Sequence, residues 1–122
     1  MVTIRRFHDE PYMQLFFSPE QQDAIAQINQ EENLSVKRCL FWNFLADCML
    51  ANQNTATLIQ YETLVEQPDT VISHLFGMPP ADIRRYITKS NKKKSELHLS
   101  DEDRESIQTI CRSHAERLGY QV

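Results

Sequence analysis

Glycine is scarce in this sequence, since Gly77 and Gly119 are the only two in 122 residues. Loops that wrap a phosphate group need several glycines, because their backbone N–H groups must converge closely on the anion. Two glycines this far apart cannot form such a loop. The sequence therefore excludes a glycine-rich phosphate-binding loop within this chain.

A basic excess and long apolar runs are also missing. The formal net charge is −4 with histidine neutral, whereas nucleic-acid-binding proteins usually carry an excess of positive charge. No apolar run reaches the roughly 20 residues that a membrane-spanning helix needs, and residues 1–12 lack the apolar core of a secretory signal. We therefore expect a cytoplasmic protein that has neither a nucleic acid nor a membrane as its partner.

The cysteine count is odd, and Cys39, Cys48 and Cys111 each lie in an apolar stretch of helical character. This context is typical of reduced, packed thiols rather than of a disulfide framework or a polarised catalytic thiol. Cys111 and His114 could share one helical face and bind a metal ion. Zinc usually takes three or four protein ligands, and the sequence offers no companion pair, so we expect no metal site.

The length predicts one domain, 1–122, and the pattern of apolar residues predicts that it is mainly helical. Ser18-Pro19-Glu20-Gln21 has the form of a helix start with a capping box, and Gly77 and Gly119 are suited to end helices. The predicted helices lie at about 18–31, 35–51, 68–76, 80–88 and 100–118.

Two segments predict strands. Thr55–Tyr61 is short, contains β-branched and aromatic residues, and follows the break at Asn52–Asn54, while Val2–Ile4 is a weaker candidate. A lone strand would leave its backbone hydrogen-bonding groups unpaired. The strand around Leu58 and Ile59 must therefore pair with Val2–Ile4, with another copy of the chain, or with sequence that is absent.

Two groups of polar residues allow either a structural or a functional interpretation. Asn43 and Asp47 share a face of an otherwise apolar helix, and this face either contacts solvent, which is the commoner case, or lines a ligand cleft. Lys92, Lys93 and Lys94 form a basic segment that is either a solvated loop or a contact for a phosphate group.

Tyr61 and Glu62 lie where the predicted strand turns toward a helix that begins near Pro68. In open α/β sheets, ligands bind at the carboxyl ends of the strands. Tyr61 could stack on a flat ring or donate its hydroxyl, and Glu62 could orient its neighbours or cap the backbone of the turn. A packed tyrosine and a purely local cap are equally compatible with the sequence.

Three features of the sequence resemble the sulfotransferase family. Tyr61-Glu62-Thr63-Leu64, followed by Pro68, is similar to that family's Tyr-Glu-Asp-Leu…Pro segment, which ends a core strand. The last predicted helix and its Leu118-Gly119-Tyr120 ending resemble the family's last helix and its Leu-Gly-Tyr finish. The apolar helix around Trp42 precedes the strand in the same order, so the resemblance covers about residues 34–120.

The resemblance implies that the chain descends from an α/β fold, the P-loop-like sulfotransferase domain, of which it would be the truncated C-terminal part. As it stands, the chain would be mostly α-helical, with one or two short parallel strands. It also implies transfer of a sulfuryl group from 3′-phosphoadenosine-5′-phosphosulfate to a hydroxyl or amine acceptor. The family's phosphosulfate loop and its catalytic base have no match in this chain. We therefore expect no catalytic residue here, and a protein that is incomplete or inactive alone.

By the same resemblance, this chain would contact only the nucleotide end of the sulfate donor. The residues expected to bind it are Arg5, Arg6, Tyr61, Lys92, Lys93 and Lys94. Tyr61 would lie beside the adenine and the basic residues beside the phosphates. Glu62 and Pro68 would have structural roles at the turn between strand and helix, and no metal ion would be needed.

Two further hypotheses remain open. The chain could be a non-catalytic helical interaction module that kept the scaffold, lost the chemistry, and now dimerises or binds a protein partner. It could instead be one part of a longer enzyme, in which a missing N-terminal segment carries the phosphosulfate loop.

Overall fold

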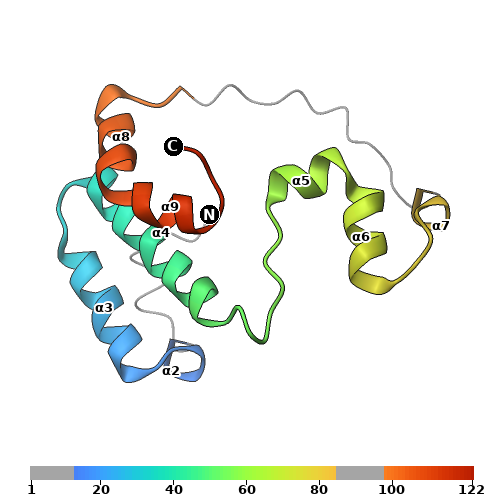
Figure 1. Cartoon of the computed structure of the whole chain (residues 1–122). Helices are drawn as coiled ribbons and strands as arrows, with labels where there is room; N and C mark the ends of the chain where they lie inside the picture. Colours follow the sequence, from blue (N-terminus) through green and yellow to red (C-terminus); the bar gives the residue numbers. More distant parts are fainter. Residues whose placement is uncertain (1–12, 85–97) are drawn as a thin grey trace. The chain divides into compact units, whose positions relative to one another are not determined.

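The computed structural model describes residues 13–84 and 98–122, which form helices joined by irregular segments (Figure 1). These described residues contain no strand, so the prediction of a mostly helical chain is confirmed. They divide into two compact units. Residues 13–53 and 98–122 make up the first unit and residues 54–84 the second, and the assignment of 1–122 to a single domain stays a prediction.

The first unit is built around its longest described helix, α4 (Leu34–Ala51). The helix α3 (Pro19–Gln30) packs along α4, and the last helical segment of the chain packs against α4 as well (Figure 1). The remaining elements of this unit are α2 (Met13–Phe16), α8 (Asp101–Ser106), the π-helix η1 (Ile107–Cys111) and α9 (Arg112–Arg117).

Local side-chain caps begin the first two long helices. Ser18 accepts a hydrogen bond from the backbone N–H of Gln21, whose side chain accepts one from the N–H of Ser18, so the predicted capping box is confirmed. At α4 the cap is Asn33, whose side chain accepts from the N–H of Val36 over 3.1 Å. Each such cap stabilises its helix by about 1 kcal/mol.

The last helical segment begins where the sequence predicts. Ser100 caps α8 by accepting from the N–H of Asp103 over 3.1 Å, and three acidic residues fill the first turn, where the helix dipole favours negative charge. The segment is not a uniform α-helix, however, because η1 widens it at Ile107–Cys111. It ends at Gly119, whose φ of +86° is a backbone conformation that suits glycine.

The core of the first unit is small and lies where α3, α4 and the last helical segment meet. Its buried apolar side chains are Ile25, Cys39, Ala46, Cys111 and Ala115. Most of these are small, which lets the helices approach closely. The aromatic rings of Phe17 and Phe44, with centroids 5.7 Å apart, pack at the side of this core.

The second unit contains three short helices: α5 (Tyr61–Glu66), α6 (Pro68–Phe76) and α7 (Pro80–Arg84). Pro68 occupies the first turn of α6, and Gly77 ends that helix in the left-handed conformation with φ +66°, both as predicted. Among residues 54–84 only Ile83 is buried. An ion pair between Asp69 and Arg84 joins α6 to α7.

The prediction of a strand at Thr55–Tyr61 is wrong. Residues 52–55 form turns, residues 57–60 are neither helix nor strand, and Tyr61 begins α5. A strand needs a partner for its backbone groups, and residues 13–84 and 98–122 provide none. The chain instead closes a helical turn, in which the N–H of Leu64 donates to the carbonyl of Gln60. The other candidate strand, Val2–Ile4, lies outside the described residues.

Candidate functional site

The residues predicted from the sequence to bind a nucleotide can be located only in part. Tyr61 is the first residue of α5, and its side chain is 70% exposed. Glu62, in the same turn, is exposed, and Pro68 begins α6. The basic candidates, Arg5, Arg6 and Lys92 to Lys94, lie outside the described residues, so their contact with Tyr61 stays a prediction.

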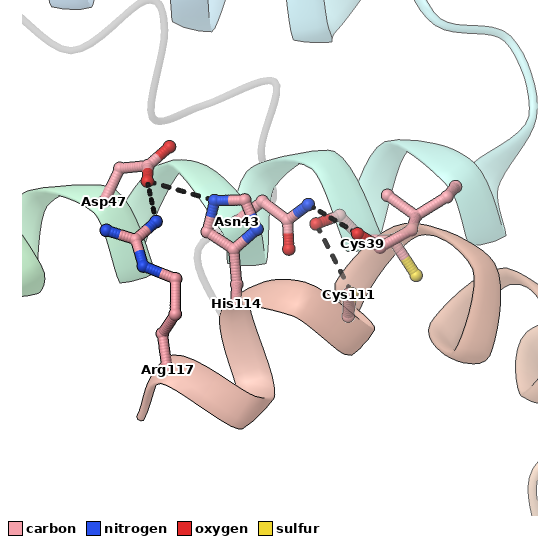
Figure 2. Close-up of polar contacts among 7 residues, drawn as sticks. Cys39, Asn43, Asp47, Cys111, His114 and Arg117 are labelled. Atoms are coloured by element: carbon pink, nitrogen blue, oxygen red, sulfur yellow. Dashed lines mark hydrogen bonds and ion pairs between the residues drawn. The ribbon is translucent and has the colours of Figure 1, made fainter. Parts of the chain in front are cut away.

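A row of side chains at every fourth position of α4 connects this helix to the last helical segment. Such spacing places residues on one face of a helix. Ser35 donates to a carboxylate oxygen of Asp103 over 2.6 Å. Asn43 donates from Nδ2 to the carbonyl of Ile110 over 2.8 Å, and Figure 2 shows this contact between its neighbours along α4. These pairs link residues nearly seventy positions apart in the chain.

Asp47 completes this row with an ionic contact. Its Oδ1 atom lies 3.0 Å from Nε2 of His114 and 3.7 Å from Nη1 of Arg117, both on α9 (Figure 2). The side chain of His114 is only 21% exposed, whereas those of Asp47 and Arg117 are more than half exposed. Solvent screens the contact with Arg117, so it stabilises the unit weakly. Asn43 and Asp47 thus do more than contact solvent.

The contact of Asn43 is made to the π-helix. The carbonyl of Ile110, which accepts from Nδ2 of Asn43, lies inside η1. Such π turns are rare and often occur at functional sites. Sequence reasoning missed this pairing, and the one available signal was a polar residue within the apolar stretch of α4.

The two thiols that meet in the core are not suited to nucleophilic chemistry. Cys111 directs its Sγ toward the carbonyl of Cys39 at 3.7 Å (Figure 2), and both are buried free thiols. Burial, reinforced by the neighbouring Cys39, raises the pKa of Cys111 to about 12. Burial also raises the pKa of Cys48. A thiol with a raised pKa stays protonated and unreactive near neutral pH.

A metal site does not assemble around Cys111 and His114 in the described part of the chain. His114 turns toward Asp47, while Cys111 packs against Cys39. Within residues 13–84 and 98–122, no group of three or more His, Cys, Asp or Glu side chains could hold a metal ion.

A groove of about 650 Å³ runs between α3 and α4, and His114 contributes to one wall. Each of the two helices supplies residues at spacings of three, four and seven, which is one continuous face. The lining residues are Ala24, Gln27, Ile28, Gln30, Glu31, Leu40, Asn43, Phe44, Asp47 and His114. Its volume lies within the range that small-molecule sites occupy, about 300–1,000 Å³.

Comparisons with known proteins place the chain in no family. No protein-family profile matches the sequence, no curated protein matches it, and no solved structure matches its fold. In the part of the chain that the structure describes, no helix is both long enough and apolar enough to cross a membrane.

Proposed function

We propose that this chain is a sulfotransferase-related protein that holds the adenosine end of 3′-phosphoadenosine-5′-phosphosulfate and does not transfer sulfate by itself. The observation that carries the proposal is the order Tyr61-Glu62-Thr63-Leu64…Pro68, which resembles the family segment and begins two successive helices. We also propose that this mostly helical chain descends from the α/β fold of the sulfotransferase domain.

Chemistry at Tyr61 supports a nucleotide contact. Tyr61 is 70% exposed at the start of α5, so a planar partner has access to its side chain. Aromatic stacking on a base contributes about 1–3 kcal/mol. Lysine ammonium groups bind phosphates as point charges, which is the role proposed for Lys92, Lys93 and Lys94. Sulfate transfer would need a phosphosulfate loop and a base, and this sequence offers no match to either.

Calorimetric titration with adenosine 3′,5′-bisphosphate tests the binding site. We expect Tyr61→Ala to weaken binding about tenfold, because the stacking surface is lost, and Lys93→Ala to weaken it and reduce its salt dependence. Tyr61→Phe keeps the ring and should bind nearly as the unmodified chain does. Binding that both Tyr61→Ala and Lys93→Ala leave unchanged would contradict the site.

The proposed lack of activity has a separate test. The purified chain, incubated with the sulfate donor and a range of hydroxyl and amine acceptors, should release no adenosine 3′,5′-bisphosphate above the rate of donor hydrolysis in buffer. Steady turnover with any acceptor would show that the chain carries its own catalytic groups and would refute this part of the proposal.

A second candidate, the non-catalytic interaction module, is supported by the exposed apolar side chains of the second unit. Residues 54–84 expose Leu58, Ile59, Tyr61, Val65, Leu75, Phe76 and Met78. A partner protein or a second copy of the chain could cover such side chains. On this proposal the chain dimerises. Light scattering should then give twice the monomer mass, and Phe76→Asp should return the monomer; a monomer at all concentrations would contradict it.

A further inference from the structure

The last helical segment of the chain, made of α8, η1 and α9, contacts α4 at both of its ends. At its start, Asp103 accepts a hydrogen bond from Oγ of Ser35 over 2.6 Å, in the first turn of α4. At its end, Nε2 of His114 lies 3.0 Å from Oδ1 of Asp47, near the last turn of α4 (Figure 2). The π-helix η1 lies between these two contacts. Its geometry therefore decides whether both ends of the segment can contact α4 together.

A row of less exposed side chains recurs at every fourth residue of this segment, at Asp103, Ile107, Cys111 and Ala115. In an α-helix of 3.6 residues per turn, each step of four residues rotates such a row by about 40°, which is about 120° over three steps. The bonds of a π-helix join residues i and i+5, so each turn holds more residues and each residue rotates the helix less. The π-helix η1 therefore reduces the rotation of this row around the segment.

A uniform α-helix in this place would change the alignment of α9. If the five residues of η1 adopted α geometry, α9 would rotate by roughly a quarter of a turn relative to α8. With α8 held by Ser35, His114 and Arg117 would then move away from Asp47, and Ala115 would leave its buried position. The contacts at the two ends of the segment thus depend on the π turn between them.

Two polar contacts from α4 are made to η1 itself. Nδ2 of Asn43 donates to the carbonyl of Ile110 over 2.8 Å, and Sγ of Cys111 lies 3.7 Å from the carbonyl of Cys39 (Figure 2). A thiol is a weak hydrogen-bond donor, whereas a side-chain amide is a strong one. Asn43 is therefore the residue of α4 that we expect to hold η1 in its π geometry.

We propose that η1 is a register switch that gives the last helical segment two arrangements. In the observed arrangement, Asn43 holds the additional residue of the π turn within Ile107–Cys111, and both ends of the segment contact α4. In the other, the segment is a uniform α-helix, α9 is rotated, and His114 is released from Asp47. Small rotations of packed helices are a recurrent way in which proteins transmit a local change. The switch does not involve Tyr61, so it and the proposed nucleotide site can fail separately.

Deletion of one residue tests the geometry. Thr109 is an exposed residue inside η1. Its removal should give a uniform α-helix that keeps both end contacts, because the turn then holds the number of residues that an α-helix needs. Deletion of Asp23, an exposed residue of the regular helix α3, is the matched control and rotates the rest of α3 by about 100°. In urea, the unfolding midpoint should stay near that of the parent chain for the Thr109 deletion and fall by at least about 1 M for the control.

Asn43→Leu tests the coupling, because leucine has a similar size and no donor for Ile110. In isotope-edited NMR of the full chain, the carbon shifts and backbone NOEs of η1 should change from the π to the α pattern. The imidazole signals of His114 should move toward those of Asp47→Ala, which lacks the contact. In the chain without Thr109, Asn43→Leu should leave the His114 signals almost unchanged, because no π turn remains to relax.

Three results would each overturn the proposal. The first is a Thr109 deletion that lowers the urea midpoint as much as the Asp23 deletion does. The second is an Asn43→Leu variant in which η1 keeps its π geometry. The third is a shift of the His114 signals by Asn43→Leu that is equal with and without Thr109. If Asn43→Leu does not fold, the pair of deletions still decides whether the π turn holds the additional residue.

Discussion

At the scale of single residues, Asn43 is the side chain whose role the structure changed most. Its Nδ2 donates to the carbonyl of Ile110 inside the π-helix, while its Oδ1 is buried without a donor among the described residues. The first contact ties α4 to the last helical segment. The buried Oδ1 is not accessible to solvent, so the role that the structure shows for Asn43 is the link between these two segments.

Replacing this amide with a carboxylate should be costly. Asn43→Asp removes the donor to Ile110 and places a negative charge beside that carbonyl oxygen, so we expect a loss of about 2–3 kcal/mol in the free energy of unfolding. Urea denaturation followed by circular dichroism measures it. Asn54→Asp, the same chemical change at an exposed position, should cost less than about 0.5 kcal/mol. Equal losses would refute the role of Asn43.

The contact between Ser35 and Asp103 should make stability depend on pH. Hydrogen bonds from Ser35, first, and from Ser100 lower the pKa of Asp103. A carboxyl group with a lowered pKa stabilises the fold above its unfolded-state pKa, and this stabilisation is lost as pH falls through the folded-state value. The stabilisation is therefore present at neutral pH and disappears in the acid range below about pH 4.

Ser35→Ala tests this pH dependence. The variant should be less stable than the parent chain at pH 7, and the difference should shrink as the pH falls below about 4 and through the lowered folded-state pKa of Asp103. Thermal unfolding over a series of pH values from 7 into the acid range measures it. Ser113→Ala, an exposed serine on α9, serves as the control and should show no such trend. A difference that stays the same across the series would contradict the assignment.

At the scale of elements, helix boundaries follow from local chemistry. Ser18, Asn33 and Ser100 cap the starts of α3, α4 and α8, and Gly77 ends α6 in the left-handed conformation. The segment before α5, residues 57–60, did not adopt the structure that its local composition predicts. Its composition suits a strand, but β-branched residues favour strands only where neighbouring strands exist to pack against. The described residues supply none, and Tyr61 starts a helix instead.

Substitution of Gly77 tests how much the C-terminal end of α6 depends on this glycine. A Cβ atom at this position would meet nothing within 4 Å, so the cost of Gly77→Ala is backbone strain at φ +66° alone. We expect a loss of about 1 kcal/mol, detected as faster amide hydrogen exchange in α6. Gly77→Asn should lose less, because asparagine tolerates the left-handed conformation better. Exchange unchanged in Gly77→Ala would show that α6 does not depend on this ending.

At the scale of the whole molecule, the two units differ in how much they bury. Among the described residues, five of the six buried apolar side chains belong to residues 13–53 and 98–122, whereas residues 54–84 bury only Ile83. Burial of apolar surface is the main stabilising contribution in a folded domain. Residues 54–84 therefore bury little apolar surface among themselves, which agrees with their many exposed apolar side chains.

Hydrogen exchange should show this difference directly. Amides in the middle of α4 and in α9 should exchange at least about a hundredfold more slowly than those of α5, α6 and α7, because local opening costs less where little surface is buried. Mass spectrometry of the full chain measures both units in one sample. If a dimer covers the second unit, protection of α5 to α7 should rise with protein concentration. Equal protection of both units at every concentration would contradict the contrast in burial.

Sequence by itself determined the features that depend on residues within one helical turn. The capping box at Ser18, the cap at Ser100, the start of α6 at Pro68 and the glycine at its end each rest on neighbours at most four positions away. Such contacts form whenever the local backbone is helical. They could therefore be predicted from the order of residues alone.

Only the tertiary structure decided which helices meet and what their faces contact. Three polar contacts join residues that are about 70 positions apart in the sequence. They are Asn43 to Ile110, Cys111 to Cys39 and Asp47 to His114. The groove beside them depends on the same pairing of α3, α4 and α9. A polar residue on an apolar helix indicates that some partner exists, but the partner is chosen by packing of the whole unit, because distant segments come together only when their combined apolar faces are buried.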